Sequence, residues 1–169
     1  MRLFIAAPLP PEAIEFIQTI RPATLPPQAR WLPPASWHLT LLFLGETPQE
    51  KVPAIDSTLQ QLIPSHSSFT LVPYQIGWKD YTLWIWLQPN PSAETLVKNL
   101  HTALGMVEPQ RLLPHITIAR RKNRPPDTPK PLRQGMPITF QEVVLYQSIL
   151  RPEGAQYIPL RCYPLSATE

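Results

Sequence analysis

The chain has 169 residues, which is the length of one ordinary domain and enough to bury a core. Although 43% of the residues are hydrophobic, no run approaches the roughly 20 consecutive apolar residues that a membrane helix needs. The single cysteine, Cys162, excludes an internal disulfide framework and favours a reducing compartment, so we expect a cytoplasmic protein. The 24 prolines greatly exceed the roughly 5% of an average chain, but they lie mostly between apolar segments, which indicates a folded domain.

The net charge of +3 comes from one segment. Residues 120–133 hold six basic residues and one acid, a charge of +5, so the rest of the chain carries −2. The prolines of this segment and its lack of apolar periodicity predict a loop, which we extend to about residues 120–137 and expect to be mobile. Two interpretations are open: a solvated surface loop, or an arm that attracts phosphate groups beside a binding site.

The first half of the chain predicts two strands and two helices. Ile14, Ile17 and Ile20 keep helical spacing after a proline pair that can open a helix. Residues 47–50 have a capping-box pattern, but Pro53 would break a helix that began there. In chain order we expect a strand at 3–9, a helix from Pro11, a proline-rich connection at 22–36, a strand at 37–44 and a helix from about Pro53.

The second half predicts a hairpin, a helix, a short strand and a final hairpin. Ser92 is the expected cap of the helix and Gly105 its end. The expected strands are 69–76 and 81–87, joined by a turn around 78–80, then 115–119, and finally 138–150 and 157–165. This order lacks a regular parallel βαβ series, so we predict a single α+β domain over residues 1–169, with helices outside the sheet.

One pattern occurs twice. The segments Trp37-His38-Leu39-Thr40-Leu41 and Pro114-His115-Ile116-Thr117-Ile118 both place His and Thr two residues apart in an apolar strand. The copies lie 77 residues apart, about half the chain, which is the spacing expected of two duplicated lobes that face each other.

Side chains two apart in a strand share a face, so each motif directs its imidazole and hydroxyl to the same side. If the two strands are adjacent, His38, Thr40, His115 and Thr117 form one cleft. A neutral imidazole can then accept a proton from an attacking group while a protonated one donates to a leaving oxygen. The hydroxyls can donate hydrogen bonds to phosphate oxygens, so the set suits phosphoester chemistry without a metal.

Other interpretations are weaker. A single His-x-Thr is more often a structural pair, but two matched copies favour function. No His-x-x-x-His or cysteine pair indicates zinc, and no Gly-x-Ser-x-Gly elbow indicates a serine hydrolase. We expect His66 and His101 at the surface. We expect Trp31, Trp84 and Trp86 in the core, with stacking of one of them on a base as the alternative.

The motifs and their flanks resemble a known family, the two-histidine phosphoesterases, and within it the RNA 2′,3′-cyclic phosphodiesterases, also called 2′-5′ RNA ligases. The resemblance covers nearly the whole chain. Its segments are Arg2-Leu3-Phe4-Ile5-Ala6, Arg30-Trp31-Leu32-Pro33-Pro34, His38-Leu39-Thr40-Leu41-Leu42-Phe43-Leu44-Gly45, Pro114-His115-Ile116-Thr117-Ile118-Ala119-Arg120, Val144-Leu145-Tyr146-Gln147-Ser148 and Gly154-Ala155-Gln156-Tyr157.

The resemblance implies two pseudo-symmetric lobes of mostly antiparallel sheet around a central cleft. It implies hydrolysis of an RNA 2′,3′-cyclic phosphate to a 2′-phosphate, with His38 as proton donor and His115 as proton acceptor, and with Thr40 and Thr117 on the phosphate. Arg120 matches a basic residue that holds the phosphate, although strand alternation points it away from His115 unless a strand end or bulge redirects it.

We also take Phe43, Tyr146 and Ser148 as candidate substrate-binding residues. The expected partners are RNA ends or small 2′,3′-cyclic nucleotides, with no metal, cofactor or membrane, and the protein is expected to be a monomer. Two alternatives stay open: an RNA- or nucleotide-binding module without the chemistry, and a ligase that runs the reverse reaction. Because the basic segment begins three residues after Thr117, we favour its role in capturing the substrate.

Overall fold

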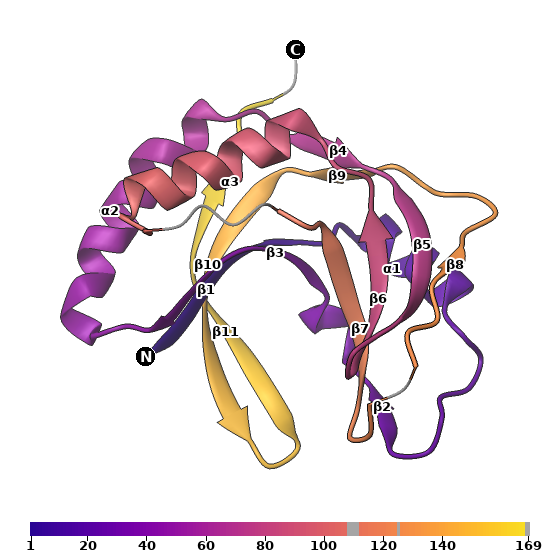
Figure 1. The fold of residues 1–169 in the computed structure, drawn as a ribbon. Helices are drawn as coiled ribbons and strands as arrows, with labels where there is room; N and C mark the ends of the chain where they lie inside the picture. Colours follow the sequence, from indigo (N-terminus) through magenta and orange to yellow (C-terminus); the bar gives the residue numbers. More distant parts are fainter. Residues whose placement is uncertain (108–111, 125, 168–169) are drawn as a thin grey trace.

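The computed structural model describes residues 1–107, 112–124 and 126–167, and it is an α+β fold (Figure 1). Its α-helices are α1 (Pro11–Ile20), α2 (Val52–Leu62) and α3 (Pro91–Ala103). Its strands are β1 (Arg2–Pro8), β2 (Ala29–Trp31), β3 (His38–Glu46), β4 (Phe69–Leu71), β5 (Pro73–Lys79), β6 (Thr82–Leu87), β7 (His115–Arg121), β8 (Lys130–Pro131), β9 (Ile138–Phe140), β10 (Glu142–Arg151) and β11 (Gly154–Pro164). The predicted fold class is confirmed.

Eight of the nine strands of the main sheet form two half-sheets of four strands each. The first has the order β11-β10-β1-β3 and the second β7-β6-β5-β8, and all of their pairings are antiparallel. The half-sheets meet where Leu39 of β3 pairs with Ile116 of β7, and further along, β2 takes over the same edge of β7. The two strands that join the half-sheets are therefore the strands that carry the His-x-Thr motifs.

The helices cover the sheet from outside. Helices α2 and α3 lie together over the first half-sheet, and α1 lies behind β5 and β6 of the second (Figure 1). Each helix buries one apolar stripe, which includes Ile17 of α1, Leu59 of α2 and Leu96 and Leu100 of α3. None of the described helices is long and apolar enough to cross a membrane.

Two predicted strands are each divided in the structure. The expected strand 69–76 becomes β4 and β5, and the expected strand 138–150 becomes β9 and β10. Strands β4 and β9 pair with each other in a separate two-stranded sheet, in which Phe69 stacks on Phe140 with 5.3 Å between ring centroids. Propensity is similar on both sides of each break, so the division follows from tertiary pairing rather than from local sequence.

The predicted cap of α3 is wrong by two residues. The side-chain oxygen of Asn90 accepts hydrogen bonds from the backbone N–H groups of Ser92 and Ala93, at 2.8 and 3.2 Å. Pro91 is then the first helical residue, a position where its missing N–H costs nothing. The prediction for His101 is also wrong: it is 5% exposed, because it lies on the inner face of α3 four residues after buried Val97.

The basic segment is not a free loop throughout. Lys130 and Pro131 form β8 on the edge of β5, and the N–H groups of Thr128 and Leu132 donate to the carbonyl oxygens of Trp78 and Tyr74, at 3.2 and 3.0 Å. These backbone bonds hold the end of the segment along β5, three strands away from β3. Residue 125 lies outside the described residues.

Candidate active site

Both motif strands carry a β-bulge at the same place. In the pairing of β1 with β3, Ile5 opposes Leu42 and Ala6 opposes Thr40, so Leu41 has no partner. In the pairing of β6 with β7, the register passes from Ala119 to Thr117 and likewise skips Ile118. Leu41 and Ile118 each follow the motif threonine, so the two copies share their backbone irregularity as well as their sequence.

The bulge changes which residues reach the cleft. A regular strand would alternate faces after Thr117, and Arg120 would point away from His115. The extra residue instead gives two consecutive buried residues, Ile118 and Ala119, and turns Arg120 back to the cleft face. The redirection that the sequence required for Arg120 is thus provided by a bulge. Phe43, five residues after His38, is turned to the cleft in the same way and is 66% exposed.

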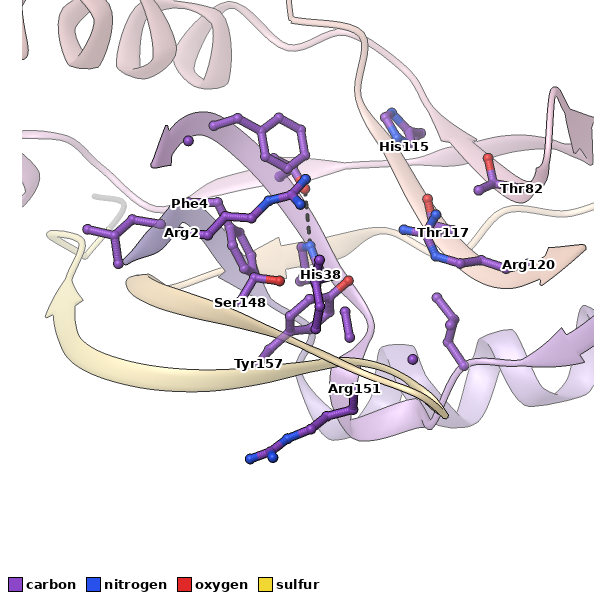
Figure 2. Close-up of a pocket in the computed structure, with 18 of the residues that line it drawn as sticks. Arg2, Phe4, His38, Thr82, His115, Thr117, Arg120, Ser148, Arg151 and Tyr157 are labelled. Carbon is purple, nitrogen blue, oxygen red and sulfur yellow. Dashed lines mark hydrogen bonds between the residues drawn. The ribbon is translucent and has the colours of Figure 1, made fainter. Parts of the chain in front are cut away.

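The cleft between the half-sheets has a volume of about 630 Å³. Figure 2 shows His115, Thr117 and Arg120 on one side, and the wall around His38 on the other. The structure therefore brings together the residues that the two motifs predicted. The motif strands supply its central lining: His38, Thr40 and Phe43 from β3, and His115, Thr117 and Arg120 from β7.

The two imidazoles are held in the same manner. Nδ1 of His38 lies 2.7 Å from the carbonyl oxygen of Ser36, and Nδ1 of His115 lies 2.9 Å from that of Leu113. A carbonyl oxygen only accepts, so Nδ1 carries the hydrogen in both rings. Nε2 is then the nitrogen that gains or loses the titrating proton. In each motif the acceptor is the residue two before the histidine.

Nε2 of His38 also contacts its own motif, with Thr40 Oγ1 at 3.1 Å (Figure 2). When the ring is neutral, the threonine hydroxyl donates to Nε2. When the ring is protonated, Nε2 donates to the hydroxyl oxygen, and the hydroxyl hydrogen is free to turn toward another acceptor. A bound phosphate oxygen would be such an acceptor.

Aromatic rings fix both imidazoles. The indole of Trp84, on β6, stacks on His115 with 3.6 Å between ring centroids and 12° between ring planes. His38 lies among Phe4, at 5.1 Å, and Tyr157, whose ring meets it edge-on at 5.3 Å. Trp84 is therefore part of the site. Trp31 and Trp84 are half-buried, and of the three tryptophans expected in the core only Trp86, 8% exposed, is there.

The surroundings favour neutral imidazoles in the empty cleft. Burial lowers the pKa of His38 below its ordinary value of 6.5, and the charges of His115 and Arg120 lower it further, while the bond to Ser36 opposes this. Burial also lowers the pKa of His115, and the bond to Leu113 opposes that shift. Protonation of an imidazole adds a positive charge, which is unfavourable here because the cleft already holds guanidinium groups.

Four arginines line the cleft, and its lining, taken over the described residues, includes no Asp or Glu. Arg120 was predicted; Arg2, Arg30 and Arg151 were not. Arg30 of β2 pairs with Arg120 of β7, and its guanidinium donates to the backbone carbonyl of Glu153 at the tip of the β10–β11 hairpin. This bond joins the two half-sheets across one end of the cleft. Arg30 and Arg2 both lie in segments that carry the family resemblance, and this was the signal by which the sequence could have identified them as site residues.

The remaining candidates divide between two cavities. Ser148 lines the cleft, whereas Tyr146 lines a cavity that adjoins it and stacks on Phe4 at 5.1 Å. Of the described part of the basic segment, only Arg120 lines either cavity. Arg124 pairs instead with Asp80, at 2.9 Å, and Lys79 pairs with Asp127, at 3.2 Å.

Within residues 1–107, 112–124 and 126–167, no three His, Cys, Asp or Glu side chains gather where they could hold a metal ion.

Comparison with known proteins identifies relatives of this chain. The sequence profile of the 2′-5′ RNA ligase superfamily matches residues 9–144. The chain belongs to this superfamily. It is 31% identical to an RNA 2′,3′-cyclic phosphodiesterase of Thermus thermophilus, in an alignment that covers 98% of this chain and 90% of the relative. The resemblance stated from the motifs is confirmed.

Solved structures of the superfamily share the fold over the full length. The crystal structure of a Thermus thermophilus protein superimposes with a TM-score of 0.78 and 28% identity, covering 100% of both chains. Escherichia coli LigT in complex with 3′-AMP superimposes with a TM-score of 0.76 and 28% identity, covering 98% of both chains. The chain therefore shares its fold with these solved structures over nearly its whole length.

Proposed function

We propose that this protein hydrolyses RNA 2′,3′-cyclic phosphates to 2′-phosphates with His38 and His115 as an acid–base pair. The observation that carries the proposal is the pair of imidazoles in one cleft, each with Nδ1 bound to a backbone carbonyl and Nε2 left for proton transfer. Further support comes from the relatives, which are named RNA 2′,3′-cyclic phosphodiesterase, and from LigT, which was crystallised with 3′-AMP and with phosphate.

In the proposed reaction a water molecule attacks the phosphorus opposite the O3′ atom. Neutral His115 accepts the water proton at Nε2 as the new P–O bond forms. In protonated His38 the O3′ atom replaces Thr40 Oγ1 as the acceptor of the Nε2 hydrogen. The proton passes to O3′ as the P–O3′ bond breaks, which leaves the phosphate on O2′. The pair ends with its protons exchanged, His115 charged and His38 neutral, and exchange with solvent restores the starting state.

The threonines and arginines stabilise the phosphate. Thr40 and Thr117 donate hydrogen bonds to the non-bridging oxygens, on which negative charge grows as water adds. Arg120 lies on the same strand as His115 and supplies a charged hydrogen bond to the same group. Phe43 and Ser148 contact the nucleoside.

Binding of the substrate favours protonation of His38, the proposed acid. In the empty cleft, burial and two positive neighbours oppose protonation of His38 and lower its pKa. A bound phosphodiester is an anion, so it offsets those charges and favours the protonated ring. Burial lowers the pKa of His115, which favours the neutral ring that a base requires. We also propose that the reaction needs no metal, and that the protein acts as a cytoplasmic monomer.

The direct test is hydrolysis of an oligonucleotide that ends in a 2′,3′-cyclic phosphate, with and without EDTA. The proposal predicts the same rate in both, because imidazoles and guanidinium groups supply the acid, the base and the charge. Binding of the oligonucleotide without turnover would instead favour a binding module. A rate that disappears with EDTA and returns with a divalent metal would overturn the metal-free mechanism.

A further inference from the structure

A second cavity, of about 650 Å³, adjoins the catalytic cleft. It lies between residues 30–38, which include the end of β2, and residues 146–159 of the β10–β11 hairpin. His38, Arg30, Arg120, Arg151 and Tyr157 line both cavities, so they form a common wall. Each cavity falls within the range of about 300–1,000 Å³ that is usual for small-molecule sites. Together they provide room for more than one nucleotide.

The common wall carries the positive charge. Arg30 and Arg120 are cross-strand partners on β2 and β7, and Arg151 lies on the opposite strand β10. The carbonyl of Glu153 fixes the guanidinium of Arg30, and the side-chain oxygen of Gln156 accepts from Nε of Arg151 at 3.2 Å. Three arginines therefore line both cavities, and guanidinium groups at such a boundary suit a phosphate that joins two nucleosides.

The other walls of the second cavity suit a base. Trp31 and Tyr146 are half-buried and line this cavity only, whereas Tyr157 stands between the two cavities. Aromatic faces bind bases by stacking, which is tolerant of sequence. Ala35 and Gln156 are exposed at its edge. The cavity thus combines aromatic and polar walls with access from solvent.

From this arrangement we propose that the second cavity binds the nucleotide immediately 5′ of the one that carries the cyclic phosphate. The phosphodiester between the two nucleotides lies at the arginines of the common wall. This inference rests on the proposed function and deepens it: the preferred substrate is an RNA of at least two nucleotides rather than a cyclic mononucleotide.

Three substrates test the proposal on the unmodified protein. They are adenosine 2′,3′-cyclic phosphate, the ApA dinucleotide that ends in the same cyclic phosphate, and that dinucleotide with its 5′ nucleoside made abasic. The expected kcat/KM is roughly tenfold or more higher for the dinucleotide than for the mononucleotide, and the abasic substrate falls between them, since stacking and phosphate contacts each contribute. Equal values for the mononucleotide and the dinucleotide would overturn the proposal, as would equal values for the abasic and full dinucleotides.

A matched pair of variants tests whether the 5′ nucleotide binds in the second cavity. Ala35→Glu puts a carboxylate at the second cavity, and Ala35→Gln puts a neutral group of the same size there. The charged variant should lower the dinucleotide-to-mononucleotide ratio of kcat/KM about threefold or more relative to the neutral one, because it repels the RNA phosphates. If both substrates slow equally, the cavity holds the terminal nucleoside and the proposal is wrong. If no substrate is hydrolysed at all, the proposed function fails first.

Discussion

Leu39 and Ile116, the central residues of the two His-x-Thr motifs, are direct partners across β3 and β7, and both are 0% exposed. Their pairing places the two motifs next to each other at the junction of the half-sheets. In each motif the histidine and the threonine flank this buried residue. Their side chains therefore both lie on the other face of the sheet, where the two strands begin to diverge. The contact that joins the half-sheets thus also brings the histidines and threonines of both motifs into one cleft.

Replacing either cleft histidine should remove most of the activity. We expect His38→Ala and His115→Ala each to lower kcat by roughly 10²–10⁴-fold, the usual contribution of a general acid or base. The measurement is steady-state hydrolysis of adenosine 2′,3′-cyclic phosphate. His66→Gln, a histidine bound to Asn99 outside the cleft, is the control and should keep full activity. Full turnover in either alanine variant would exclude the acid–base pair.

Trp84 is a positioning residue because it stacks on His115. Trp84→Leu should lower kcat by roughly tenfold with little change in KM, since the imidazole loses its fixed plane. Trp84→Phe keeps an aromatic face and should recover most of the loss, which a merely structural defect would not do. A rise in KM with unchanged kcat would show that Trp84 binds the substrate instead. Thermal unfolding of both variants checks that they are folded.

Arg120 and Arg121 are adjacent in sequence, but only Arg120 of the two lines the cleft. Arg120→Ala should raise KM by roughly tenfold or more, since a charged hydrogen bond contributes about 1.5–3 kcal/mol. Arg121→Ala, the matched control, should leave KM nearly unchanged, as should neutralising Lys122 and Arg124. A comparable rise in KM from those changes at low salt would contradict this and support the basic segment as a substrate-capturing arm.

The pH dependence should separate the free and the bound enzyme. The profile of kcat/KM reports the free enzyme, in which His115 must be neutral and His38 protonated. Both pKa values are lowered, so the optimum should lie below pH 6.5. The bound phosphodiester raises the pKa of His38, so the alkaline limb of kcat should move to higher pH. A kcat/KM that continues to rise up to pH 8 would contradict this assignment.

The packing of the basic segment against β5 can be tested at Gly77. A Cβ atom at this residue would overlap the backbone of Thr128 and Pro129. Gly77→Ala should therefore lower the free energy of unfolding by about 1–3 kcal/mol, measured by urea denaturation. Gly105→Ala has open space around its Cβ but a positive φ of 67°, so it separates backbone strain from overlap. No loss of stability in Gly77→Ala would mean that the segment leaves β5 easily.

The sequence predicted the centre of the site because the motifs depend on a local rule, the alternation of side chains along a strand. It also predicted that Arg120 needed a strand end or a bulge. It could not show that Leu41 and Ile118 are both the bulged residues, since bulges depend on the neighbouring strand. Phe43 and Arg120 reach the cleft for this reason.

Three features that the sequence did not place correctly depend on contacts distant in sequence. The basic segment has the composition of a loop, but its backbone pairs with β5, about 50 residues earlier. The short β2 has no apolar alternation, and its pairing with β7 is what brings Arg30 beside Arg120. Trp84 is a large apolar residue in an apolar strand and therefore resembles a core residue. Only the pairing of β6 with β7 places it on His115.

The identity of the product tests the central claim most directly. Hydrolysis of adenosine 2′,3′-cyclic phosphate can give 2′-AMP or 3′-AMP, and ³¹P NMR with authentic standards distinguishes them. If His38 donates its proton to O3′, the product is 2′-AMP, and His38→Ala slows its formation by roughly 10²–10⁴-fold. A 3′-AMP product would contradict the account, because the proton would then have gone to O2′.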